Sequence, residues 1–287
     1  VQGGIATGIK VERLVSLGSL FYEPLAIFYR SADPVDRLSQ FSGKRLAIGA
    51  EGSGTRALAL TLLKANGIES GGRTALLDLS GEDAARALTE HKIDAVFLTG
   101  DSATPPLMRK LLQTPGIRVF NFVQAEAYTR RFRYLTRLEL PMGTLDLGKN
   151  SPERTLYLIA PTVELVAREN LHPAISDLLI EAAREIHGSA TLLQHAGEFP
   201  APLEHEFRIS NDAARYYKSG KRFLYRALPF WLASLADRAF VVLVPIVVLL
   251  LPGLRLVPSL YQWRVRARIY RWYGVLIRLE REGLMNS

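Results

Sequence analysis

The chain has 287 residues, which is long enough for one or two globular domains with a sizeable core. It contains no cysteine, which excludes disulfides and thiolate metal sites but is compatible with either the periplasm or the cytosol. The formal net charge is +8, and residues 255–287 carry +5 of it, so the basic charge lies mainly at the end of the chain and we expect no nucleic-acid-binding face.

An aromatic and β-branched run near the start, Leu17–Tyr29, predicts extended structure. Pro24 lies inside this run, which disfavours a central strand and favours an edge strand or a crossing segment. Asp33-Pro34 then predicts a turn, and Val35–Phe41 predicts a short helix before Ser42-Gly43.

A strand, a glycine-rich loop and a helix follow next. The apolar residues Leu46–Ile48 predict the strand, and Gly49–Gly54 predicts a tight turn. From Thr55 onward apolar residues recur at helical spacing, and Asn66-Gly67 predicts the end of the helix. The first N–H groups of such a helix have no intrahelical partner and the helix dipole adds positive charge, so we expect this turn to bind an anion.

Four residues of this loop are suited to that role. Gly52 and Gly54 let a ligand approach the backbone closely, and the hydroxyl groups of Ser53 and Thr55 add hydrogen bonds. The loop is not a Walker A motif, because Thr55 rather than lysine follows its last glycine, and it is not a nucleophile elbow, because Glu51 and Thr55 replace the two flanking glycines. A tight turn with Ser or Thr as the helix N-cap is the alternative interpretation.

Strand and helix patterns alternate over the next part of the chain. The predicted strands are Ala75–Leu79, Ile93–Leu98 and Ile117–Phe122, and the predicted helices are Ala84–Glu90 and Pro105–Gln113. This alternation over short loops predicts right-handed βαβ units and a parallel sheet. Because ligands bind beyond the carboxyl ends of strands in such sheets, we expect the loops Gly49–Thr55 and Thr99–Ser102 to converge on one cleft.

The following segment is predicted to hold a helix at Ala125–Tyr134, a strand at Thr155–Ala160 and an amphipathic helix at Pro173–His187. The first of these helices carries three clustered arginines, Arg130, Arg131 and Arg133. They form either a solvated helix face or an anion clamp or docking patch. The five histidines show no metal-binding spacing and we find no catalytic arrangement, so we expect no metal, no cofactor and no enzymatic activity.

The character of the chain changes after Arg226. The sixteen residues Ala239–Leu254 are uncharged, and with their flanks they reach the ~20 residues that a bilayer-spanning helix needs. Arginines interleaved with aromatic residues follow directly, which favours a cytoplasmic tail beside anionic membrane lipid. A buried helix or hairpin in a soluble core is the alternative interpretation.

Five short motifs lie in order along the chain. They are Val1-Gln2-Gly3-Gly4, Phe21-Tyr22-Glu23-Pro24-Leu25, Gly52-Ser53-Gly54-Thr55, Asp94-Ala95-Val96-Phe97 and Ala213-Ala214-Arg215-Tyr216-Tyr217-Lys218-Ser219-Gly220. Their order and spacing resemble the TAXI family of solute receptors of TRAP transporters. The resemblance implies an α/β, type II periplasmic-binding-protein-like two-lobed fold, with a C-terminal transmembrane helix as in a subset of the family. It also implies an N-terminally truncated fragment, because the glycine turn of the first motif lies deep in the first lobe of that family.

On this resemblance we expect five parts. Residues 1–30 are the remnant of lobe 1 and the first crossover, 31–122 are lobe 2, 123–226 return to lobe 1, 227–257 are an interfacial segment with the transmembrane helix, and 258–287 are the basic cytoplasmic tail. The lobes would lie in the periplasm and be tethered to the bacterial inner membrane, and the partners would be a TRAP-type membrane permease and inner-membrane lipid.

The resemblance also implies a ligand and its contacts. A small carboxylate, either an amino acid or a dicarboxylate, would bind between the lobes, held by Ser53, Gly54 and Thr55 beside Gly52. Further contacts are expected from Gln2, Gly3 and Gly4 in the other lobe, from Tyr22 as a wall, and from Phe97 and Thr99 at a strand exit. The alternative function is a membrane-tethered ligand sensor or regulatory module of the same fold. An enzyme of this fold would need a general base near Ser53, and only Glu51 is close to it in sequence.

Overall fold

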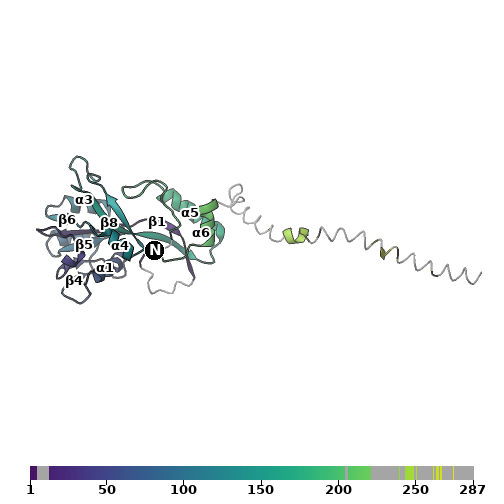
Figure 1. The fold of residues 1–287 in the computed structure, drawn as a ribbon, viewed down its shortest axis with the longest axis horizontal. Coiled ribbons are helices and arrows are strands. Elements are labelled where there is room, and N and C mark those ends of the chain that lie inside the picture. Colours follow the sequence, from purple (N-terminus) through teal and green to yellow (C-terminus); the bar gives the residue numbers. More distant parts are fainter. Residues whose placement is uncertain are drawn as a thin grey trace, which may run out of the picture. The chain divides into compact units, whose positions relative to one another are not determined.

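The chain forms two compact units, Val1–Gly220 and Lys221–Ser287, in a computed structural model. The structure describes residues 1–4, 13–203 and 206–220, together with residues 239, 243–248, 250, 261, 263, 264, 266 and 274 of the second unit. All named strands and helices belong to the first unit, which is the part with element labels in Figure 1.

The second unit is described only in short helical pieces. Residues 243–248 are helical, and large apolar side chains among them are about half exposed. Within the described part of the chain, no helix has both the length and the apolarity that crossing a membrane requires. Most of the predicted span at 227–257 and most of the predicted tail lie outside the described residues.

One sheet of the first unit has five strands in the order β4-β3-β5-β2-β6. The strands are β2 (Ala26–Arg30), β3 (Arg45–Ala47), β4 (Ala75–Leu77), β5 (Ala95–Leu98) and β6 (Ile117–Val119). β3 pairs in parallel with β4 and β5, as the βαβ pattern predicts. β2 differs from the prediction, because it is an interior strand of the sheet and lies antiparallel between β5 and β6.

The interior position of β2 agrees with its burial on both faces. Ile27 and Tyr29 pack with Phe97 in one core, whereas Ala26 and Phe28 face the other core. When successive side chains of a strand point into two apolar cores in turn, its sequence is a continuous apolar run. Pro24, which argued against a central strand, lies just before β2 and therefore interrupts no ladder hydrogen bond.

Helices cover both faces of this sheet. The first core contains side chains from α1 (Gly54–Ala65) and the 3-10 turn η1 (Leu38–Phe41), and the second contains those from α2 (Gly81–Thr89) and α3 (Pro105–Gln113). The three α-helices lie within a few residues of their predicted positions, and α3 has the predicted bounds.

The second sheet is antiparallel, with the order β1-β8-β7. Its strands are β1 (Leu14–Tyr22), β7 (Leu135–Leu140) and β8 (Leu156–Arg168), and the helices α5 (Pro173–His187) and α6 (Asn211–Ser219) pack against β1. Strand β7 was not predicted, and β8 extends well beyond the predicted Thr155–Ala160. The short helix α4 (Ala125–Arg131) leads into β7.

The chain passes between the two sheets at the segment that joins β1 to β2. The N–H of Glu23 donates to the carbonyl oxygen of Pro161 at 2.9 Å, and the N–H of Leu25 donates to that of Ile159 at 2.9 Å. These bonds tie the connection to β8. The five-part division of the chain into lobes and tail stays a prediction.

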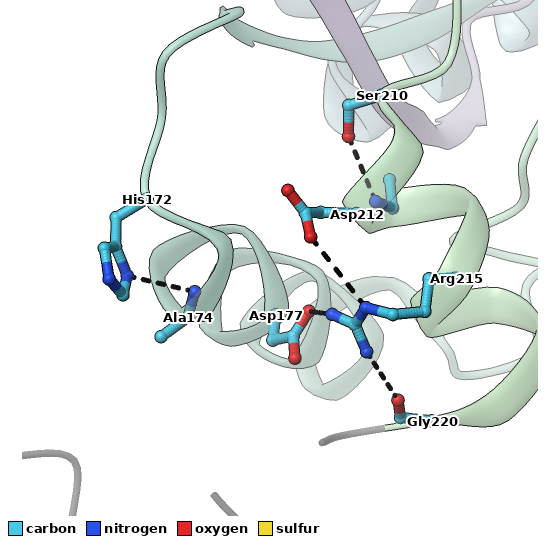
Figure 2. A network of polar contacts seen from close by, with 8 residues as sticks. His172, Ala174, Asp177, Ser210, Asp212, Arg215 and Gly220 are labelled. Atoms are coloured by element: carbon cyan, nitrogen blue, oxygen red, sulfur yellow. Dashed lines mark hydrogen bonds and ion pairs between the residues drawn. The ribbon is translucent and has the colours of Figure 1, made fainter. Parts of the chain in front are cut away.

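An ionic network joins α5 to α6 (Figure 2). The guanidinium of Arg215 donates to Asp177 Oδ1 at 2.7 Å and to the carbonyl oxygen of Gly220 at 3.2 Å, and its Nε lies 3.8 Å from Asp212 Oδ1. Asp177 is almost fully buried on α5. The network therefore holds the C-terminal end of α6 against α5.

Candidate ligand-binding site

The loop from β3 to α1 is a tight turn whose backbone requires glycine. Gly49 has φ +96°, and a β-carbon there would lie 2.8 Å from Ser53 Oγ and 3.0 Å from Thr55 Cβ. Gly52 also has a positive φ, but a β-carbon there would meet nothing within 4 Å. Crowding within the loop thus explains why glycine is needed at position 49, whereas the space beside Gly52 is open.

Ser53 is the N-cap of α1. Its Oγ accepts the N–H of Arg56 at 3.2 Å and donates to the carbonyl oxygen of Ala50 at 2.7 Å. In this conformation the side chain of Ser53 therefore has the role that the alternative interpretation of the loop gave it, that of the helix N-cap. Capping leaves the N–H groups of Gly54 and Thr55 without an intrahelical partner, and both lie at the positive end of a helix of 12 residues.

The loops that follow β3 and β5 meet at a pair of hydroxyl groups. Thr55 Oγ1 and Thr99 Oγ1 are 2.7 Å apart, and only 6% and 3% of the two residues is exposed. A single hydrogen bond uses one of the two hydroxyl hydrogens, so the pair keeps a second hydrogen that can be donated. We expected the two loops to converge because both follow the carboxyl ends of predicted parallel strands, and the 2.7 Å contact brings them together.

Arg56 adds a positive charge to the same loop. Its guanidinium donates to the carbonyl oxygen of Gly49 at 3.5 Å and forms an ion pair with Asp78. The arginine was not among the predicted ligand contacts. Its position in the first turn of the predicted helix, directly after the Gly-Ser-Gly-Thr motif, could have indicated it as a candidate, because anions bind at helix N-termini.

Glu23 is a second residue near this place that the sequence interpretation missed. Its carboxylate lies against Gly100, the residue after Thr99, so closely that a β-carbon on Gly100 would overlap Oε1. Burial raises the pKa of Glu23, and the negative charge of Asp101 raises it further. A carboxylate placed just before Pro24 in an otherwise apolar run was the signal for it.

Tyr22 and Phe97, two of the predicted ligand contacts, pack against other side chains of the fold in this conformation. The hydroxyl of Tyr22 donates to Glu198 Oε1 at 2.7 Å and its ring packs edge-on against Phe199, and burial together with Glu198 raises the pKa of Tyr22 to about 12. Phe97 is fully buried in the core and packs edge-on against Phe41. Both rings therefore take part in side-chain packing within the fold.

Gln2, Gly3 and Gly4 lie along the second sheet. Gln2 bridges to Val163 of β8, the N–H of Gly3 donates to the carbonyl oxygen of Thr162 at 2.9 Å, and Gly4 packs on the ring of Tyr134. Gln2 is 8% exposed, and no described residue forms a hydrogen bond with its Nε2. The three residues therefore lie on the three-stranded sheet, whereas the Thr55–Thr99 pair lies at the ends of strands of the five-stranded sheet. Glu23, whose N–H donates to the carbonyl oxygen of Pro161, lies in the segment that connects the two sheets.

Metal binding has no structural support in the described ranges, where no group of three or more His, Cys, Asp or Glu side chains is arranged to hold an ion. One arginine of helix α4 lies on a solvated face of the helix, as one of the two interpretations predicts. Arg130 forms an exposed i,i+4 ion pair with Glu126 at 3.0 Å.

The family model described as "NMT1-like family" matches residues 3–183. A comparison with curated proteins finds no match. Among solved structures, the substrate-binding protein of an amino acid ABC transporter is 11% identical, with a TM-score of 0.37 over 64% of this chain and 62% of that one. An ancestral arginine-binding protein bound to arginine is 14% identical, with a TM-score of 0.34 over 62% and 61%. The periplasmic aliphatic sulphonate-binding protein SsuA from Escherichia coli is 20% identical, with a TM-score of 0.33 over 55% and 45%. The chain thus spans less than two thirds of each of these proteins.

Proposed function

The chain belongs to the NMT1-like family, and on that premise we propose that it is an extracytoplasmic solute receptor that binds a small carboxylate. The observation that carries the proposal is the buried Thr55–Thr99 hydroxyl pair at the N-terminus of α1. A receptor of this kind needs affinity and closure around its ligand and no chemical step.

The donors at this place suit one carboxylate group. The N–H groups of Gly54 and Thr55 and the spare hydroxyl hydrogen of the pair are backbone and side-chain donors near the positive end of α1. Hydrogen bonds to an ionised acceptor are roughly twice as strong as those between neutral groups. The Arg56 guanidinium adds a longer-range attraction, which its ion pair with Asp78 reduces.

The opposite side of the ligand would be covered by the second sheet. We assign this role to Gln2, Gly3 and Gly4, because Gln2 Nε2 is a hydrogen-bond donor for which the described residues supply no partner, and the two glycines directly follow Gln2 in the chain. Closure would occur about the connection between β1 and β2, where the chain passes from one sheet to the other.

The finer assignment concerns transport. We place the chain in the TAXI branch, working with a TRAP-type permease and tethered to the inner membrane by the apolar run at 239–254 with the arginine-rich segment on the cytoplasmic side. The support is the motif order and the composition of the C-terminal segment.

The proposal is tested by thermal unfolding of the full chain in a mild detergent against amino acids, dicarboxylates and keto acids. A ligand present at a hundred times its dissociation constant adds about 2.7 kcal/mol of stability. We expect an upward shift of Tm with one class of small carboxylate. The shift should be lost in Thr55→Val, which keeps the shape of the side chain and removes the hydroxyl.

Thr61→Val is the matched control. Thr61 lies on the same helix, and its hydroxyl donates to the carbonyl oxygen of Ala57 at 2.9 Å, away from the loop. The control should keep the ligand-induced shift. Binding that survives Thr55→Val unchanged, or a panel in which no carboxylate raises Tm, would show that this loop is not the carboxylate site.

A further inference from the structure

Helix α5 carries an apolar stripe on its solvent-facing side. The stripe consists of Ile175, Leu178, Leu179 and Ile186, which are 40%, 48%, 38% and 70% exposed, and of Ala182, which is exposed as well. With 3.6 residues per turn, these five positions fall within about 100° around the helix axis and extend over about three turns. The helix therefore presents one continuous apolar surface to solvent.

The opposite side of α5 is packed against the protein. Ile180 is fully buried in the core that α5 shares with β1 and α6. Asp177 accepts a hydrogen bond from Arg215 of α6 at 2.7 Å (Figure 2). These contacts fix the rotation of the helix about its own axis, so the fold itself holds the stripe in its exposed position.

Acidic side chains border the stripe. Glu181 and Glu185 each lie three residues after a member of the stripe and therefore beside it on the helix surface. The sequence of α5 contains no lysine, and its one arginine, Arg184, lies over the ring of Tyr216, with 5.5 Å between the guanidinium carbon and the ring centroid. The charge along the border of the stripe is thus negative.

An exposed apolar surface with a polar rim is typical of an interaction site. We propose that α5 docks an amphipathic helix of a partner protein, whose apolar residues cover the stripe and whose basic residues face Glu181 and Glu185. A helix matches the stripe in shape, because two helices interlock along rows of side chains three and four residues apart. This inference goes beyond the receptor function and does not depend on the ligand.

Two other occupants fit this surface less well. A second copy of the chain would bring the same acidic border, and a stripe of about 17 Å by 10 Å is small beside the roughly 800 Å² that each partner buries in a specific dimer. An anionic lipid surface would be repelled by the two glutamates, since helices that lie on membranes carry Lys and Arg beside their apolar face.

The test measures the fluorescence anisotropy of labelled peptides that are titrated with the full chain. The chain is held in nanodiscs of phosphatidylcholine, which has no net charge, and binding to nanodiscs without the protein is subtracted. Two synthetic helical peptides of about 16 residues have the same leucine stripe, bordered by lysines in one and by glutamates in the other. We expect saturable binding of the lysine peptide and about 10-fold weaker binding of the glutamate peptide.

Two pairs of variants locate the surface. Ile186→Asp should weaken binding of the lysine peptide about 10-fold or more, whereas Leu147→Asp, at an 87% exposed leucine in the loop between β7 and β8, should leave it unchanged. Glu185→Lys should reduce the preference for the lysine peptide, and Glu153→Lys, an equal charge reversal at an exposed residue of that loop, should preserve the preference.

Equal binding of the two peptides, or an equal loss through Leu147→Asp and Ile186→Asp, would overturn the inference. Self-association of the wild-type chain that Ile186→Asp abolishes would assign the stripe to a second copy, and binding that the nanodiscs alone account for would leave α5 without a role; both results contradict a partner helix. The ligand-induced Tm shift reports the receptor function separately and should be the same in Ile186→Asp as in the wild-type chain.

Discussion

Replacing Arg215 with methionine should destabilise the first unit by about 2–3 kcal/mol, because it removes a guanidinium from a buried carboxylate. The side chain of Asp177 is only 5% exposed and lies 2.7 Å from Arg215. Breaking a fully buried ion pair costs about 3–5 kcal/mol. The side chain of Arg215 is 28% exposed, so water screens the pair in part and we place the cost below that range.

The cost is measured by urea unfolding followed by far-ultraviolet circular dichroism. Tryptophan fluorescence is unsuitable, because the three tryptophans lie at 231, 263 and 272, outside the first unit. A double-mutant cycle with Asp177→Asn isolates the pair, and we expect the two losses to be less than additive by at least about 1 kcal/mol.

Arg208→Met is the matched control. Arg208 pairs with Glu169 at the same kind of distance, 3.0 Å, but both side chains are more than half exposed. An exposed pair contributes less than about 1 kcal/mol. The reasoning is refuted if Arg215→Met costs no more than Arg208→Met, or if the cycle gives no coupling.

Three further predictions concern the sheets and the loop. Burial is the main reason that the pKa of Glu164 is raised, so the contribution of Glu164 to stability is full at low pH and is lost as pH rises through the folded-state pKa. Glu164→Gln removes this loss and should therefore stabilise the chain more at pH 8 than at pH 4 in urea unfolding. Equal effects at the two pH values would contradict this. Gly49→Ala should cost ~2–4 kcal/mol, against ~1–2 kcal/mol for Gly52→Ala, since both residues have positive φ but only Gly49 is crowded; similar losses would show that crowding is unimportant. Tyr22→Phe removes a 2.7 Å hydrogen bond to Glu198 and should lower the free energy of unfolding by about 1–2 kcal/mol in the same assay, and an unchanged value would mean that water replaces the bond.

Local signals in the sequence were sufficient to place most helices. Pro105 and Pro173 stand at the first positions of α3 and α5, which have the predicted bounds, and Ser53 caps α1. Proline at the first helical position and a serine N-cap act over a single turn, so neither depends on the rest of the fold.

Pairing between distant strands was decided by the tertiary structure alone. The apolar run around Phe28 predicts extended structure whatever its partners, and only the packing of two cores places β2 antiparallel between β5 and β6 inside the five-stranded sheet. Strand β7 went unpredicted for a related reason: it is extended because β8 pairs with it.

The candidate site divides in the same way. The sequence by itself determined the glycine-rich loop and the helix N-terminus, and it predicted the convergence of the loops after β3 and β5, because the parallel strands of βαβ units end at the same edge of a sheet. The 2.7 Å contact of Thr55 with Thr99 and the position of Glu23 against Gly100 depended on the tertiary structure. These contacts join residues more than forty positions apart in the chain, and only the packing of the assembled sheets fixes such distances.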